Sequence, residues 1–186
     1  MYINPVPIII AAVAALAVLI PAVWWIKTGN KFKRGNIKID EALSGIEVAL
    51  TKRFDMLTKQ LDVAKGFAKH EKELFTEVIN LRRGMSVGEL GQAAGQMDAM
   101  ASRLNVVAEN YPQLRSSDVF VQLQSGIRDA EEHLQAARRL YNSNVTSLNT
   151  AIEVFPSSIV AKAKNVQKRE FFEAEAHKKA DVSMSF

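Results

Sequence analysis

The three histidines are the first residues to consider for chemistry, because the chain has no cysteine that could act as a nucleophile or bind metal. They are His70, His133 and His177. A helical zinc site needs two histidines four residues apart on one helix face, and no pair here has that spacing. We therefore predict no metal site and interpret His70, which Glu71 follows, as a surface or bundle-edge side chain.

A hydrolase would need a serine nucleophile elbow or paired carboxylates in a cleft, and we assign neither to this sequence. No glycine-rich loop with phosphate-binding spacing occurs either. The missing cysteines also exclude disulfides and favour a reducing compartment. We predict no catalytic residue, no cofactor and no enzymatic activity.

Several polar side chains fall in or beside apolar helix stripes, where a polar group is costly unless it is paired. They are Arg53, Arg138, Asn142 and Asn149. We interpret them as a buried network that fixes helix register, in which Arg53 or Arg138 meets Glu109 or Glu131. The alternative is that the network lines a groove for a partner helix or peptide.

Charge and composition narrow the class of protein. The net charge of +4 lies in residues 27–186 and is spread through helices of mixed sign, apart from two local basic clusters. Nucleic acid is therefore not expected as a partner. With only five prolines and nine glycines and no long alternating stretch, the composition favours helices.

The N-terminal segment is expected to span a membrane. Residues 6–26 carry no charge, and at ~1.5 Å rise per residue they cover ~30 Å, the hydrocarbon thickness of a bilayer. Pro7 lies near the start of this helix, and Pro21 removes one hydrogen bond near its end. The bilayer is thus the first expected partner.

The flanking residues predict which end of the segment is cytoplasmic. Five cations occur before the first acid at Asp40, whereas the N-terminal flank has no charged side chain. The expected interface residues are Trp24, Trp25, Lys27, Lys31, Lys33 and Arg34. The positive-inside rule then places the N-terminus outside and the remainder in the cytoplasm. The alternative, a cleaved signal peptide, lacks its basic n-region.

Three long amphipathic helices are predicted after the anchor. The first starts at Ile39 and ends near Gly84, which suits a left-handed cap, and Ser86 with Glu89 forms a capping box that starts the second. The second ends by Tyr111 because a proline follows. Its apolar stripe is Leu90, Ala94, Met97, Ala101, Leu104, Ala108 and Tyr111.

The third helix starts after Ser116 or Ser117 and carries apolar residues from Phe120 to Phe155, before Pro156 ends it. Short connections predict an antiparallel bundle. The fold class is all-α, with one transmembrane helix followed by long antiparallel helices. The expected organisation is an external N-terminus and span (1–26), a basic segment (27–38), the bundle (39–156), and a short helix or strap with a tail (157–186).

Three strings stand out in the soluble part: Lys65-Gly66-Phe67-Ala68-Lys69-His70-Glu71, Glu109-Asn110-Tyr111-Pro112, and Phe155-Pro156-Ser157. Together they resemble the LemA family of membrane-anchored helical bacterial proteins, over about residues 36–186. The polar residues within the resembling blocks are Arg53, Asp55, Glu109, Asn110, Glu131, Arg138, Tyr141, Asn142 and Asn149. The family usually has Ile-Pro-Asn after the aspartate, where Leu57-Thr58-Lys59 stands here, so an unkinked first helix is expected.

The resemblance implies a helical bundle in a membrane and supplies no reaction. Combined with the anchor, it leads us to expect a cytoplasmic scaffold or adaptor on the inner membrane that binds another, unidentified membrane protein. The alternative is a structural protein that self-assembles as a homo-oligomer and organises or shapes the bilayer, which narrow Ala/Gly-rich seams would favour.

Overall fold

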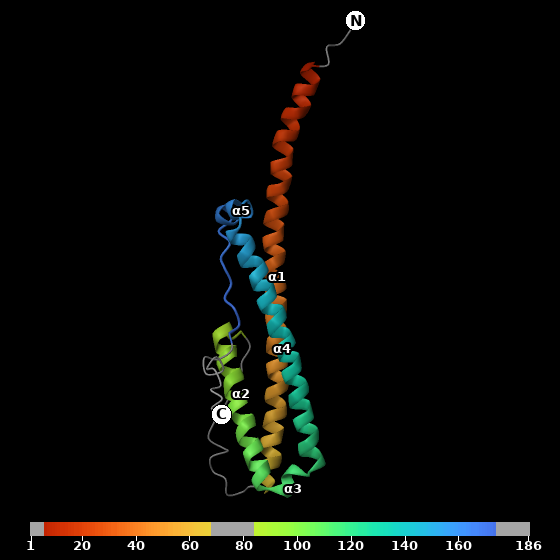
Figure 1. Ribbon diagram of the computed structural model, residues 1–186, viewed down its shortest axis with the longest axis vertical. Coiled ribbons are helices and arrows are strands. Elements are labelled where there is room, and N and C mark those ends of the chain that lie inside the picture. Colours follow the sequence, from red (N-terminus) through yellow and green to blue (C-terminus); the bar gives the residue numbers. More distant parts are fainter. Residues whose placement is uncertain (1–5, 68–83, 174–186) are drawn as a thin grey trace, which may run out of the picture. The chain divides into compact units, whose positions relative to one another are not determined.

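A computed structural model describes residues 6–67 and 84–173, and within these ranges the regular secondary structure is helical, with no strand (Figure 1). The helices are α1 (Val6–Phe67), α2 (Val87–Asn110), α3 (Pro112–Arg115), α4 (Asp118–Glu153) and α5 (Ser157–Ala163). The all-α prediction is confirmed. The end of the first predicted soluble helix, including Phe75 and Val78, lies outside the described residues.

The chain forms two compact units. The anchor unit comprises residues 1–39 and 144–169, and the bundle unit comprises residues 40–143 and 170–186. Both α1 and α4 contribute to each unit. The two units are described separately below.

α1 is one continuous helix that includes three segments predicted separately: the apolar span, the basic residues 27–38 and the first amphipathic stripe as far as Phe67. It contains Pro21 and passes uninterrupted through Leu57-Thr58-Lys59, where the family's proline is missing. The most apolar window of α1 has a mean hydropathy of 2.5, and none of it is buried inside the protein. By length and composition this part of α1 can cross a membrane.

The anchor unit packs α1 against the end of α4 and against α5. Its buried residues include Phe32 on α1, Val145 and Leu148 on α4, and Val160 and Ala161 on α5. A Cβ placed on Gly35 of α1 would lie 3.2 Å from a methyl carbon of Leu148, so the missing side chain lets the two helices approach closely.

The bundle unit places α1 and α4 antiparallel, whereas the predicted alternation of consecutive helices would have made the first and third long helices parallel. Gly45 faces Ala137, while Met56, further along α1, contacts Gly126, which is earlier in α4. Among the described residues of this unit, the largest fully buried apolar side chains come from α1, α2, α3 and α4: Ile46, Leu50, Leu57, Leu90, Met97, Leu104, Leu114, Phe120, Leu134 and Tyr141. Each isolated helix exposes one apolar stripe, so mutual burial of these stripes provides the core.

The turn before α2 agrees with the sequence. Gly84 has φ +76°, a conformation that glycine adopts without a Cβ clash. Ser86 is the N-cap of α2: its hydroxyl accepts a hydrogen bond from the Glu89 N–H at 3.3 Å, and its own N–H donates to the Glu89 carboxylate at 2.7 Å. The predicted capping box is confirmed.

The other boundaries differ in detail. α2 ends at Asn110, as expected, but the one-turn helix α3 follows and was not predicted. The stripe of α2 is wider than predicted, because Ala93 and Val107 are also buried. The assignment of Phe155 to the buried stripe of the third helix is wrong: α4 ends at Glu153, and Phe155 is 77% exposed.

The segment after Pro156 contains both of the structures that the sequence left open. The short helix α5 comes first, and residues 166–173 follow without helical structure. We call residues 166–173 the strap.

Candidate functional site

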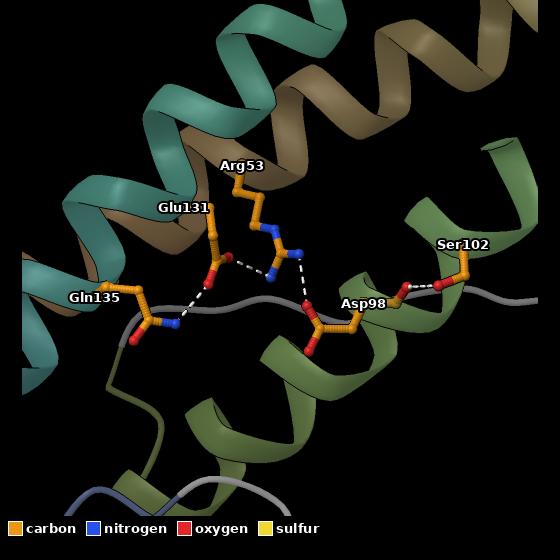
Figure 2. A network of polar contacts seen from close by, with 5 residues as sticks. All are labelled: Arg53, Asp98, Ser102, Glu131 and Gln135. Carbon is orange, nitrogen blue, oxygen red and sulfur yellow. Dashed lines mark hydrogen bonds and ion pairs between the residues drawn. The ribbon is translucent and has the colours of Figure 1, made fainter. Parts of the chain in front are cut away.

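Among the described residues of the bundle unit, Arg53 has the most buried charged side chain, and it is only 5% exposed. Figure 2 shows it between acids of two other helices. Its Nη2 donates to the Asp98 carboxylate of α2 at 2.6 Å, and its Nη1 lies 3.1 Å from the Glu131 carboxylate of α4. Both carboxylates are partly buried. One guanidinium of α1 therefore joins three helices, and we call Arg53, Asp98 and Glu131 the ion triad.

The acids of the ion triad have further contacts that fix their positions. Gln135 donates from Nε2 to the second Glu131 oxygen at 2.7 Å, and the Ser102 hydroxyl donates to the backbone carbonyl of Asp98 at 3.0 Å. Within the described residues, Nε of Arg53 has no hydrogen-bond partner. Buried charges are stabilised only when opposite charges lie close to them, and here two acids surround one base.

Arg138 lies near the same charges. Burial lowers the pKa of its guanidinium, the acids Glu131 and Asp98 raise that pKa, and the positive charge of Arg53 lowers it. The guanidinium carbon lies 4.9 Å from the ring centroid of Phe172, a cation–π contact with the strap. Arg138 thus contacts the strap through the ring of Phe172.

A second set of predicted polar residues binds the backbone of the strap within the bundle unit. Asn142 donates from Nδ2 to the Phe172 carbonyl at 3.0 Å, and its Oδ1 accepts from the Phe172 N–H at 2.8 Å. The Tyr141 hydroxyl donates to the Glu170 carbonyl at 2.9 Å. An asparagine amide has one donor side and one acceptor side, so it can satisfy both backbone groups of an extended residue, as a neighbouring strand would.

The same contact occurs once in the anchor unit. Asn149 donates to the Arg169 carbonyl and accepts from the Arg169 N–H, both at 2.9 Å. Nη1 of Arg169 also donates to the side-chain Oδ1 of Asn36 on α1 at 3.4 Å. We call the two amide pairs, Asn142 with Phe172 and Asn149 with Arg169, the asparagine clamps.

The distance between the two clamping asparagines along α4 is similar to the distance between the two strap residues that they bind. The clamping asparagines are seven residues apart on α4, which is ~10 Å of helix, and the clamped residues are three apart, which is ~10 Å of extended chain. Two turns of helix therefore match three residues of strap.

The remaining residues from the resembling blocks lie elsewhere. Asp55 of α1 and Glu109 and Asn110 of α2 are exposed and belong to neither the ion triad nor the clamps. The acid that pairs with Arg53 from α2 is Asp98, which sequence reasoning missed. Its position directly after Met97, on the border of the α2 stripe, was the available signal.

The predicted membrane-interface residues lie together on α1. Trp24 is partly exposed, and the other five are exposed: Trp25, Lys27, Lys31, Lys33 and Arg34. The whole anchor unit contains nine Lys and Arg residues but only one acid, Glu153. This unit is strongly basic around the end of the apolar span.

The histidines give no support to a metal site in the described part of the chain. His133 is exposed, with its Nε2 3.6 Å from the Asp129 carboxylate one turn earlier. His70 and His177 lie outside the described residues. Within the ranges 6–67 and 84–173, no group of three His, Asp or Glu side chains is placed to hold a metal ion.

The string Gly84-Met85-Ser86-Val87-Gly88 has the spacing of a hydrolase nucleophile elbow, although only its turn and cap were recognised above. A nucleophile elbow holds its serine in a strained turn, whereas Ser86 has ordinary extended angles, φ −63° and ψ 161°. Its hydroxyl accepts the capping hydrogen bond from Glu89. The geometry assigns Ser86 to helix capping.

The anchor unit has a shallow groove of about 660 Å³ between the end of α4, α5 and the strap. Its charged lining residues include Glu153 and Lys168, which form an ion pair with each other. The charges of Glu153 and Lys168 therefore cancel each other in this groove.

Comparison with known proteins shows the family of this chain. The LemA family profile matches residues 42–186, which include the ion triad and both clamps. Protein LemA of Metamycoplasma hominis is 27% identical over 161 residues, covering 84% of this chain and 74% of that protein. The chain belongs to the LemA family.

Proposed function

We propose that this protein is a membrane-anchored helical scaffold or adaptor that binds other membrane proteins and does not itself catalyse a reaction. The observation that carries this proposal is that the buried polar side chains bind other parts of the same protein. Arg53 binds carboxylates of two other helices, and Asn142 and Asn149 bind the strap backbone. These contacts stabilise the fold and leave those groups engaged with the protein itself.

We further propose that the apolar part of α1 crosses the cytoplasmic membrane once, with the N-terminus outside and the bundle unit in the cytoplasm. The positive-inside rule supports this orientation, because the basic residues follow the span and none precedes it. The basic composition of the whole anchor unit adds to that asymmetry.

An exposed apolar surface on the bundle unit offers a place for a partner. Asn105 of α2 accepts a hydrogen bond from Gln124 of α4 at 3.0 Å, which brings these two helix faces together. Val106 and Val121, each within one turn of that bond, are both about half exposed. We propose that this surface contacts the partner, since aliphatic side chains gain free energy when a partner covers them.

Site-specific photo-crosslinking in native membranes tests the adaptor function. A photoreactive residue at Val106 or Val121 should form an adduct with one integral membrane protein, identified by mass spectrometry. Val119 is the matched control, because it is a valine of similar exposure two residues from Val121 and so on another side of α4. If no site gives a specific adduct, or Val119 gives the same one, the proposed surface is wrong.

One feature of α2 favours the alternative of a self-assembling structural protein. Gly88, Gln92, Gln96 and Ala99 are exposed, uncharged and spaced by three or four residues, so they lie along one side of the helix. A Cβ on Gly88 would meet nothing within 4 Å, so this face has room for a close neighbour. A second copy of the chain could pack here.

The solution mass of the full-length protein in mild detergent, combined with electron microscopy, separates the two functions. A large closed or helical homo-assembly would favour the membrane-organising alternative. A monomer or dimer would favour the adaptor.

A further inference from the structure

The corner between α4 and α5, residues 154–164, exposes several large apolar side chains to solvent. Phe155 is 77% exposed, and Val154 and Ile159 are about half exposed. The opposite face of α5 is buried through Val160 and Ala161. Ile159 and Ala163 are four residues apart on one face of α5, and Phe155 lies in the turn directly before this helix.

This corner lies level with the end of the apolar span. A Cβ on Gly29 of α1 would lie only 2.5 Å from Cε of Lys164, so the stem of that lysine lies against Gly29. Gly29 is three residues beyond Ile26, where the uncharged span ends, which is ~4.5 Å along the helix. The polar layer of each leaflet is ~5–8 Å thick. Figure 1 shows α5 beside the orange part of α1.

The charge of the corner matches anionic lipid. Lys162 and Lys164 are exposed on it, and the anchor unit has nine cations for its one acid. That single acid, Glu153, is paired with Lys168. Exposed apolar groups flanked by lysines are the pattern of a peripheral surface that enters the lipid interface while its lysine side chains reach the headgroups.

We propose that the α4–α5 corner is a second membrane contact, in which Val154, Phe155 and Ile159 enter the interface and Lys162 and Lys164 bind anionic headgroups. This inference rests on the membrane anchoring proposed above and extends it from one helix to two elements of the anchor unit. The occupant is a lipid surface, because the position beside the apolar span and the excess of positive charge both favour it.

Single-cysteine labelling of the full chain tests this contact, since the protein has no cysteine of its own. Val154→Cys and Phe155→Cys would carry a polarity-sensitive fluorophore in vesicles of phosphatidylcholine, with or without phosphatidylglycerol. We expect blue-shifted emission and protection from aqueous iodide in the anionic vesicles. Val119→Cys is the matched control, because Val119 is 53% exposed and Val154 is 52% exposed. Its label should stay accessible in both vesicles.

Vesicle flotation separates failure of the anchor from failure of the corner contact. Protein that does not float with vesicles would overturn both proposals. Protein that floats, with Val154→Cys as accessible to iodide as Val119→Cys, would overturn only the corner contact. Equal protection on neutral and anionic vesicles would also contradict it, as would protection that requires an added membrane protein.

A charge variant provides the second test. Lys162→Glu should remove the difference between anionic and neutral vesicles in the Phe155→Cys label, whereas Lys52→Glu, an exposed lysine of the bundle unit, should leave it unchanged. Raising the salt from 0.1 M to 1 M shortens the screening length from about 10 Å to about 3 Å and should weaken the protection. A salt-insensitive signal would contradict the role of the lysines.

Discussion

The anchor unit and the bundle unit use the same two helices, α1 and α4, but they place charge differently. The anchor unit has nine cations and one acid, a net charge of +8, whereas the rest of the chain has fifteen cations and nineteen acids. One acid cannot neutralise nine cations, so most Lys and Arg side chains of the anchor unit have no acidic partner available within that unit. In the bundle unit, Arg53 is buried between two acids.

This difference indicates what each kind of charge can do. A buried charge must be neutralised by its own protein, because the free energy of transfer from water is otherwise several kcal/mol. An exposed charge is solvated and can attract an external surface of opposite sign. The bundle unit therefore uses charge to join helices, and we propose that the anchor unit uses it at the membrane.

The largest predicted effect is on Arg53. Arg53→Met removes the cation between Asp98 and Glu131 and should lower the free energy of unfolding by about 3 kcal/mol or more. Urea unfolding in mild detergent, followed by circular dichroism, measures the change. Lys52→Met is the control, because Lys52 is the residue before Arg53 and also pairs with an acid of α4, but in a more exposed position. If both variants lost the same unfolding free energy, the buried ion pairs of Arg53 would be no more important than the exposed pair of Lys52.

Substitution of the clamping asparagines tests whether the anchor unit and the bundle unit each hold the strap by an asparagine side chain. Asn149→Ala and Asn142→Ala each remove two hydrogen bonds and should each cost about 1–3 kcal/mol of unfolding free energy. Hydrogen exchange should show faster exchange of the Arg169 amide in the first variant and of the Phe172 amide in the second.

Asn144→Ala is the control for the clamps, because Asn144 makes a single, exposed hydrogen bond to the Lys38 carbonyl at 3.2 Å. Its effect on stability should be smaller than that of either clamp variant. Unchanged exchange at Arg169 in Asn149→Ala would show that the clamp does not protect the strap.

A smaller effect should depend on pH. The hydrogen bond and positive charge of Lys52 lower the pKa of Asp129 below its usual value near 3.9. The stabilisation by this pair is therefore present above about pH 4 and is lost as the pH falls through the lowered pKa of Asp129. Unfolding of wild type and Lys52→Met between pH 7 and pH 2 should give curves that converge at acid pH. A difference that persists there would exclude the ion pair as its cause.

The smallest effect on stability is expected in the anchor unit. Lys31→Gln with Lys33→Gln removes two exposed cations and should change the unfolding free energy by no more than about 0.5 kcal/mol. The same variant should weaken the orientation bias, which protease protection in spheroplasts measures. A large loss of stability would mean that these cations are used inside the protein, as in the bundle unit.

Local sequence signals predicted most helix boundaries. Gly84 and the Ser86–Glu89 capping box act within a few residues, so their effect did not depend on the rest of the fold. The uncharged span is also a local property of composition and length. Phe155 shows the limit of periodicity, since the apolar pattern continues to Phe155, two residues beyond the end of α4 at Glu153.

The pairing of the polar residues was only partly predictable. Arg53, Asn142 and Asn149 stood out because they interrupt or border apolar stripes, and Glu131 was one of the expected partners. Asp98, 45 residues from Arg53, and the strap residues, 20 and 30 residues from their asparagines, were not identified. The residues next to an asparagine in the sequence do not indicate which backbone segment, far away in the sequence, its side chain will bind.

The sequence by itself determined the helical class, the apolar span, the helix caps and which polar residues need partners, because these follow from the chemistry of neighbouring residues. Only the tertiary structure decided which acids meet Arg53, which extended residues meet the asparagines, and that Asp55, Glu109 and Asn110 stay exposed. Those choices depend on how the helix faces pack, since a partner is selected by the geometry of the whole core and not by its distance along the chain.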